Sequence, residues 1–348
     1  MRAIDFFCGA GGLTRGLLDA GIEVVCGVDA DGRCKDSYEK NNRPAQFHHA
    51  DICEVTAANV WKLLGSRRTS DLLIAGCAPC QPFSKHRRRG KDSRSVASQD
   101  PDATLLGAFA TLVEAILPTQ VLVENVPGIA RVKGFSTYRR FTRMLHAYGY
   151  NVAEGVLDAK HYGVPQTRRR YVLLAVKGCE IDLPQRQFWP GEKEYLTVRQ
   201  AIAHYPPLGA GAEHAVIPNH RTAALSRLNI ERIRKTPHDG GDRRAWPKSL
   251  TLDCHKDNYT GHTDVYGRMA WDKPAPTLTG KCISLSNGRY GHPIQNRAIS
   301  LREAASLQTF PDSYVFYGEQ QHIAQQIGNA VPVAFAEVIG RHLIDTLR

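Results

Sequence analysis

The chain has 348 residues, of which 42% are hydrophobic, and its formal net charge is +11. This size and content predict one large domain with a sizeable core and a second, smaller domain. We expect neither a signal peptide nor a membrane-spanning segment, and nine scattered cysteines exclude a small disulfide scaffold, so we expect a cytoplasmic protein with reduced thiols.

The first half of the chain alternates between two patterns. Apolar β-type runs are predicted as strands at 4–7, 22–28, 72–75, 120–123, 151–157 and 171–176. Helical patterns lie between them at 13–20, 55–64, 103–117 and 135–148. Alternating strands and helices predict an α/β fold whose parallel sheet is doubly wound, with helices on both faces.

The second half changes character near residue 180. Residues 181–298 are rich in Pro, Gly, His, Asn and Arg and predict a smaller, loop-rich domain. Ser300 and Glu303 form a capping box that predicts a helix start, within a connecting segment at 299–317. We expect one long amphipathic helix over 318–348, which packs back on the first domain and completes residues 1–180.

Residues 5–12, DFFCGAGG, follow the first strand and contain glycines that let a ligand approach the backbone. Asp29 lies at the end of the second strand, where an acidic side chain accepts hydrogen bonds from a ribose. Asp51 follows the run FHHA in a similar place. Thr14 stands where a dinucleotide-binding loop has its third glycine, so S-adenosylmethionine, with a ribose and no phosphates, fits better.

Residues 76–84, GCAPCQPFS, place Cys77 and Cys80 three apart after an apolar run. Such a pair is a redox couple, half of a zinc site, or a nucleophile with a bystander. No second CxxC is present, so we predict no metal site. Residues 85–94, KHRRRGKDSR, are basic and directly adjoin the pair, which favours a polyanionic partner.

Six segments, taken in order, resemble the motifs of the DNA cytosine-5 methyltransferases. They are DFFCGAGG, GCAPCQPFS, VENV (123–126), QTRRR (166–170), SLREAASLQTFPD (300–312) and QIGNAVP (326–332). The resemblance runs from residue 4 to about residue 335 and excludes only the variable region 180–270. It implies a Rossmann-like methyltransferase fold whose second domain recognises DNA.

The resemblance also implies site residues. Cys80 would be the nucleophile, Glu124 the carboxyl that contacts the target cytosine, and Arg168 and Arg170 its neighbours. The implied cofactor contacts are Phe7, Gly9, Gly11, Gly12, Asp29, Ala30, Asp51, Ile52, Pro79 and Asn329. The implied contacts to DNA or to the flipped base are Gln81, Ser84, Arg87, Arg88, Arg89 and Gln166.

The implied reaction moves a methyl group from S-adenosylmethionine to carbon 5 of cytosine in double-stranded DNA and leaves S-adenosylhomocysteine. A thiolate adds to carbon 6 of a base flipped out of the duplex. The basic segment 85–100 is expected to close over that base. We expect the basic residues in 221–244, with Trp246 and Arg268, to belong to the DNA-reading domain, where each is more often a phosphate contact or a structural residue than a base reader.

Alternatives remain open at this point. A thioredoxin-like redox protein would use both cysteines of CAPC, and a catalytically dead relative would bind DNA without methylating it. We expect a monomer whose system partner is a cognate restriction endonuclease, although the sequence does not separate such an enzyme from a solitary one. The chain also does not reveal the DNA sequence that is recognised.

Overall fold

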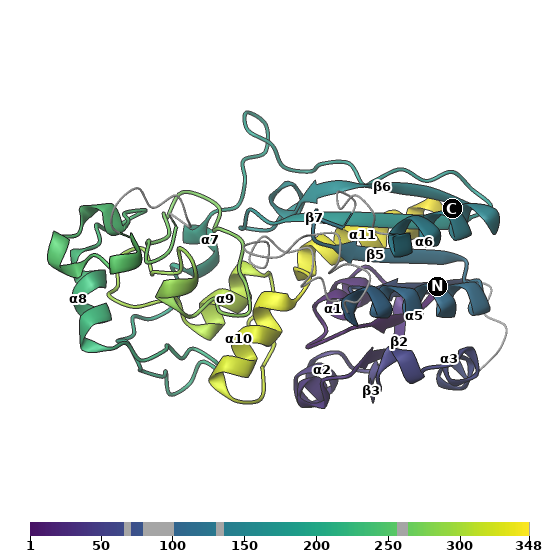
Figure 1. The fold of residues 1–348 in the computed structure, drawn as a ribbon, viewed down its shortest axis with the longest axis horizontal. Coiled ribbons are helices and arrows are strands. Elements are labelled where there is room, and N and C mark those ends of the chain that lie inside the picture. The colour runs from purple at the N-terminus through teal and green to yellow at the C-terminus, as the bar shows by residue number, and fades with distance from the viewer. Residues whose placement is uncertain (66–70, 79–100, 130–135, 256–263, 348) are drawn as a thin grey trace. The chain divides into compact units, whose positions relative to one another are not determined.

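The computed structural model describes residues 1–65, 71–78, 101–129, 136–255 and 264–347. The chain divides into two compact units (Figure 1). The first unit contains 1–158, 169–186 and 333–348, and the second contains 159–168 and 187–332. Over the described ranges, no helix combines the length and the apolar character that crossing a membrane requires.

A seven-stranded sheet forms the centre of the first unit, in the order β3-β2-β1-β4-β5-β7-β6. The strands are β1 (Arg2–Phe6), β2 (Glu23–Asp29), β3 (Gln46–His49), β4 (Leu72–Gly76), β5 (Gln120–Asn125), β6 (Tyr150–Asp158) and β7 (Arg169–Lys177). Strands β1 to β5 are parallel, and β7 runs antiparallel to both of its neighbours. Successive side chains along a strand point to opposite faces of the sheet, so these apolar strands give the sheet an apolar surface on both faces.

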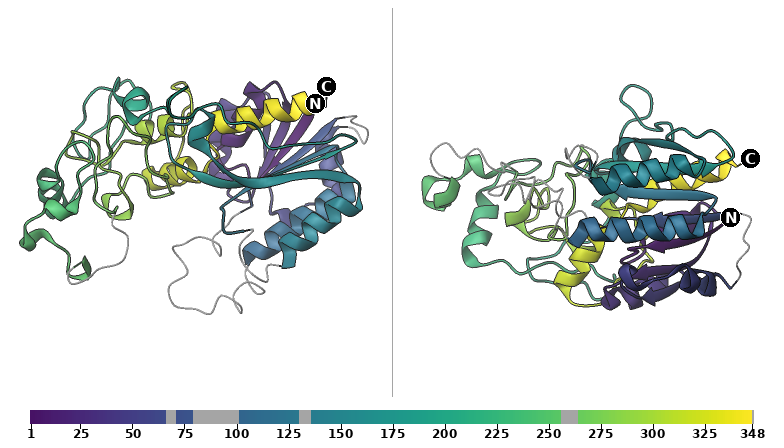
Figure 2. Two further views of the ribbon diagram at one scale, coloured as in Figure 1. Left: turned by 90° about the horizontal axis from the view of Figure 1, so that it is seen from above. Right: turned by 45° about the vertical axis from the view of Figure 1, so that its right-hand side comes forward.

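Helices cover both faces of this sheet. They are α1 (Gly12–Asp19), α2 (Lys35–Asn41), α3 (Ala57–Leu64), α5 (Pro101–Ile116), α6 (Ser136–Ala147) and α11 (Val333–Thr346). Figure 2 shows α11, in yellow, on one side of the sheet and α5 with α6 on the other. Helix α1 packs against α11, while α3, α5 and α6 join the main core through residues such as Val60, Phe109 and Phe141. The doubly wound α/β prediction is therefore confirmed.

Two features of the prediction are wrong. The sheet is mixed, because the link between β6 and β7 contains no long crossover helix and β7 therefore pairs antiparallel with β6. The single helix expected over 318–348 is two helices, α10 (Gln320–Asn329) and α11. Pro332 separates them, since it lacks a backbone N–H and holds the residue before it in an extended conformation.

The second unit contains short helices, α7 (Val198–Ile202), α8 (Arg227–Lys235), α9 (Leu301–Leu307) and α10, joined by long irregular segments. Its boundaries differ from the expected 181–298 domain, because α9 packs against α7 and α10 and so draws 299–332 into this unit. The return to the first unit begins at Val333. The capping box of Ser300 and Glu303 is present at the start of α9, as predicted.

Buried arginines organise the second unit. The guanidinium of Arg268 is fully buried and donates to the backbone carbonyls of Ile233, Thr236, His292 and Gln295. Arg297 forms a buried bidentate pair with Glu303, with both N–O distances 2.7 Å. The Trp246 indole donates to Thr236 Oγ1 at 2.8 Å inside the same unit. Arg268 and Trp246 are thus structural, and the basic composition overstates how much charge faces outward.

Replacing Gly16 with alanine is expected to destabilise the first unit. An added Cβ would lie 2.4 Å from the Val333 carbonyl oxygen and 2.5 Å from Ala336 Cβ, so α1 and α11 could not keep their approach. Such overpacking costs about 1–3 kcal/mol, measured as a lower urea midpoint. Gly107→Ala is the matched control, because its Cβ would have only Thr137 Cγ2 nearby, at 3.8 Å, in a helix that favours alanine. Equal losses in both variants would contradict this account.

Candidate active site

The loop between β1 and α1 has the backbone conformation that its glycines allow. Phe7, Gly9 and Gly11 all have positive φ angles, of 60°, 51° and 89°. A Cβ on Gly11 would lie 2.4 Å from the Asn42 side chain, so only glycine fits there. A Cβ on Gly9 would meet nothing within 4 Å, which leaves space for a ligand beside this part of the loop.

Asp29 fixes this loop from the end of β2. One carboxylate oxygen accepts the Gly9 backbone N–H at 2.8 Å, and the other accepts the Asp31 N–H at 2.8 Å. Burial raises the pKa of Asp29, although these two backbone hydrogen bonds oppose the shift. A carboxylate oxygen accepts more than one hydrogen bond, so Asp29 retains acceptor capacity for a ligand hydroxyl.

The next predicted cofactor residues lie at the adjacent strand end. Pairing of β2 with β3 places Asp29 beside His49, so exposed Ala30 and exposed Asp51 follow neighbouring strands. Asp51 Oδ1 caps the short helix η2 (Ile52–Glu54) by accepting the Cys53 N–H at 2.9 Å. Of the predicted cofactor residues, the structure thus gathers Phe7, Gly9, Gly11, Gly12, Asp29, Ala30, Asp51 and Ile52 at the carboxyl ends of β1, β2 and β3, where open parallel sheets bind ligands.

Glu124 and Arg170 form the most chemically informative pair in the first unit. Glu124 is on β5 and Arg170 on the adjacent β7, and Arg170 Nε lies 3.0 Å from Glu124 Oε1. Their side chains are only 10% and 13% exposed. The N–H of Arg170 is not aligned for a hydrogen bond with Oε1, so the contact is a charge pair by distance only. Among the described residues, Glu124 Oε1 therefore has no hydrogen-bond donor, and this position of the carboxylate is open to a ligand.

Cys77 lies close to the same carboxylate at the end of β4. Burial raises the pKa of its thiol well above the ordinary range, and the Glu124 charge adds to that effect. A thiol in such surroundings stays protonated and is a poor nucleophile. This agrees with the interpretation that Cys77 is a packing residue. Pro79, Cys80, Gln81, Ser84, Arg87, Arg88 and Arg89 lie outside the described residues.

Asn125, the residue after Glu124, has a role that sequence reasoning missed. Its side-chain amide donates to the Ala78 carbonyl at 3.1 Å and accepts the Val126 N–H at 2.8 Å. It therefore holds the backbone two residues before Cys80. The motif VENV contained the only signal, since a buried asparagine at the end of a strand must satisfy its own amide.

Three predicted site residues belong to the second unit. Gln166 is fully buried and binds Gln308 Oε1, the Leu307 carbonyl and the Leu278 N–H. Arg168 is 2% exposed and donates to the carbonyls of Leu278, Gly328 and Ala330. Within this unit both side chains hold backbone segments together. Asn329 is exposed at the last position of α10.

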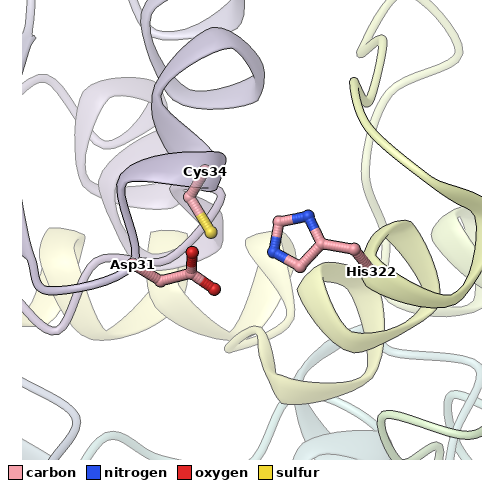
Figure 3. A group of neighbouring side chains, drawn as sticks. All are labelled: Asp31, Cys34 and His322. Carbon is pink, nitrogen blue, oxygen red and sulfur yellow. The ribbon is translucent and has the colours of Figure 1, made fainter.

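Figure 3 draws three side chains of the types that bind metals. Asp31 is the N-cap of the η1 segment (Gly32–Cys34) of the first unit and Cys34 is its last residue, whereas His322 belongs to α10 of the second. Because the trio is divided between the two units, no metal site is assigned. Asp31 accepts the Arg33 N–H and pairs with its guanidinium at 2.7 Å. Burial raises the pKa of the Cys34 thiol to about 12.

The chain is similar in sequence and in fold to known proteins that are named as methylases or methyltransferases. The chain is 39% identical to the Type II methylase M.HgiDII of Herpetosiphon aurantiacus, over 98% of this chain and 94% of that protein. It is 34% identical to the Type II methyltransferase M1.HphI of Haemophilus parahaemolyticus, over 98% and 86%. A solved structure described as a putative DNA modification methyltransferase of an E. coli prophage has the same fold, with a TM-score of 0.76 at 23% identity, over 100% and 99%. The chain also matches the family described as C-5 cytosine-specific DNA methylase over residues 1–345, and it belongs to that family.

Proposed function

We propose that this protein transfers the methyl group of S-adenosylmethionine to carbon 5 of a cytosine in a specific double-stranded DNA sequence, through a covalent adduct of Cys80 at carbon 6. The observation that carries the proposal is the buried Glu124–Arg170 pair, located beside the strand that leads to Cys80. A carboxyl held in this way suits a ring nitrogen that gains electron density when a thiolate adds to the ring.

The chain's own residues fit the proposed cofactor. The open space beside Gly9 and the remaining acceptor capacity of Asp29 suit a ribose, and the partly buried Phe7 ring offers an aromatic surface to an adenine. Asp51 and Ile52, on the neighbouring strand end, would face that adenine. When bound, S-adenosylmethionine supplies an electrophilic methyl group on a sulfonium.

The proposed roles of the chain's residues follow the electron flow. The Cys80 thiolate forms a bond to carbon 6, which makes carbon 5 nucleophilic toward the methyl group. Glu124 holds a proton at ring nitrogen 3 as charge builds there, and Arg170 fixes the direction of the Glu124 carboxyl. Once carbon 5 carries the methyl group, a base takes its proton, the double bond between carbons 5 and 6 forms again, and the bond from carbon 6 to Cys80 breaks to return the thiolate. The target base must leave the duplex for this chemistry, at a cost of a few kcal/mol.

Methyl transfer from labelled S-adenosylmethionine to unmethylated mixed-sequence duplex DNA tests the proposal. Bisulfite sequencing of the product is expected to show methylation at one cytosine of a fixed short sequence. Label on adenine or on the exocyclic nitrogen of cytosine would overturn the assignment of carbon 5. No label on any DNA would favour the catalytically inactive alternative.

Two relatives carry Type II names, which supports a role beside a restriction endonuclease. Under this proposal the endonuclease is a partner in the system, and the methyltransferase acts as a monomer in the cytoplasm and on the nucleoid. DNA methylated by the protein would resist cleavage by that endonuclease. Sedimentation of the protein with and without duplex DNA measures the mass of the species in solution and so tests whether it is a monomer.

Asn125→Ala is expected to lower kcat by about 100-fold, the effect of misplacing a reacting group by about 1 Å. The change frees the Ala78 carbonyl and with it the segment that carries Cys80. The affinity for S-adenosylmethionine, measured by calorimetry, should stay within error of the wild type. Asn151→Ala is the matched control, because Asn151 makes a similar bond to the Cys179 carbonyl, at 2.8 Å. A similar loss of kcat in both variants would refute a positioning role for Asn125.

A further inference from the structure

Asp5, the first residue of DFFCGAGG, is a fully buried carboxyl at the end of β1. One oxygen, Oδ2, accepts the Thr14 hydroxyl of α1 at 2.7 Å, and that hydroxyl also contacts the Tyr38 hydroxyl of α2 at 3.0 Å. The other oxygen, Oδ1, is buried and has no hydrogen-bond partner among the described residues. An unsatisfied buried acceptor lowers the stability of the folded protein, so the presence of one directly before the glycine loop calls for a functional explanation.

The groups that face Asp5 are acidic or neutral. Asp29 and Cys26 face it from β2, Cys8 from the loop, Tyr38 from α2 and Cys77 from the end of β4. Burial raises the pKa of Asp5 to about 7, the Thr14 bond opposes the shift, and the Asp29 charge adds to it. No basic group among the described residues contributes to this shift. Asp5 therefore titrates near neutral pH.

A cation placed at the end of β1 would change this balance. The carboxyl ends of β1 and β2 are the ligand-binding edge of a parallel sheet, and the loop with positive φ angles at Phe7, Gly9 and Gly11 directly follows the strand that carries Asp5. S-adenosylmethionine carries a sulfonium charge, whereas its product is a neutral thioether. Both share the same amino-acid end, so the sulfonium is the charge that differs. A charge in a poorly solvated site interacts strongly with a buried carboxyl.

Resting on the proposed function, we propose that Asp5 is a charge-sensing positioning residue: the sulfonium of S-adenosylmethionine ionises its carboxyl, the neutral product does not, and the loop thereby prefers substrate over product. The ionised form also strengthens the hydrogen bond from Thr14, since a charge-assisted bond is stronger than a neutral one. Bound substrate thus strengthens the hydrogen bond between β1 and α1, and loss of the sulfonium after methyl transfer weakens it.

The sign of the pH dependence follows from proton release. Substrate binding requires the ionised carboxyl, so affinity for S-adenosylmethionine falls as pH drops below about 7, by up to tenfold per pH unit. Above that pH Asp5 is already ionised and contributes no further slope. Affinity for S-adenosylhomocysteine should change less over the same range. The ratio of the two affinities removes contributions from groups that both ligands share.

Calorimetric titration of the protein with each ligand between pH 5.5 and 8.5 tests the proposal without relying on turnover. In buffers of different ionisation enthalpy, S-adenosylmethionine is expected to release a proton at pH 6.5 that S-adenosylhomocysteine does not. Asp5→Asn should remove this difference and reduce the preference for S-adenosylmethionine several-fold at pH 8. Asp36→Asn, an exposed carboxylate on α2, should leave it unchanged.

The wild-type protein offers a second readout if Asp5→Asn does not fold. Carbon-13 NMR of the Asp5 carboxyl should titrate near pH 7 in the free protein and remain ionised when S-adenosylmethionine is bound. Equal pH dependence for both ligands would overturn the role of Asp5 and leave the proposed function intact. Failure to bind either ligand would refute the cofactor assignment and the Asp5 proposal with it.

Discussion

Cys80→Ser is expected to reduce methyl transfer to background, whereas Cys77→Ser should retain most of it. The attacking group must be a thiolate, and a serine hydroxyl is far less ionised at neutral pH. Cys77 meets the opposite conditions, because its burial and the nearby Glu124 charge hold its thiol in the protonated form. Its backbone N–H bonds to the Phe6 carbonyl at 3.3 Å, a contact that serine preserves. Transfer of labelled methyl groups to duplex DNA measures both variants.

A covalent trap separates loss of chemistry from loss of binding. Fluorine at carbon 5 of the target cytosine cannot be removed as a proton is, so the adduct persists on a denaturing gel. Wild-type protein and Cys77→Ser should form the adduct, and Cys80→Ser should not, while all three bind S-adenosylmethionine. Equal loss in the two cysteine variants would instead support a redox pair, the alternative that CAPC allowed.

The alternation of apolar strands and helices was sufficient to predict the doubly wound core, because burial on both faces leaves a strong periodic pattern. It could not predict the direction of β7. Apolar runs look alike in parallel and antiparallel strands, and direction depends on the connecting segment. The division of the last helix was readable in principle, since Pro332 stands inside the apolar pattern of 318–348. The amphipathic pattern continues on both sides of Pro332, and for this reason the sequence predicted one helix in place of two.

The candidate site likewise contains some residues that the sequence could predict and others that it could not. Glycine conformation and strand-end carboxylates are local properties, so Gly9 and Asp29 could be recognised from order and spacing. Burial is not local. Gln166 and Arg168 match a motif, yet their polar atoms are used by backbone groups from residues 278 to 330, which no spacing in QTRRR reveals. Asn125 was missed for the same reason, because its partner at Ala78 is 47 positions away.

Glu124→Gln is expected to lower kcat by about 10²–10⁴-fold, the range that general acid–base groups contribute. Glutamine keeps the shape of the side chain but neither carries the charge that attracts Arg170 nor exchanges a proton at a ring nitrogen. Calorimetry with S-adenosylmethionine should show unchanged affinity, since the cofactor residues lie at other strand ends. Retention of wild-type kcat would exclude Glu124 from the chemistry.

Two of the three arginines of QTRRR, Arg168 and Arg170, should affect different properties of the protein. Arg170→Lys moves a flexible point charge to the position of a planar guanidinium, so kcat should fall while the unfolding midpoint changes little. Arg168 reaches the buried carbonyls of Leu278, Gly328 and Ala330 through two separate nitrogens, and the single ammonium nitrogen of lysine does not span the same positions. Each carbonyl that is left unsatisfied costs about 1–3 kcal/mol. Arg168→Lys should therefore lower the urea midpoint of unfolding, while kcat per folded molecule stays close to the wild-type value. A lower kcat for Arg168→Lys with an unchanged unfolding midpoint would show that the guanidinium of Arg168 acts on the reaction, and would contradict its structural role.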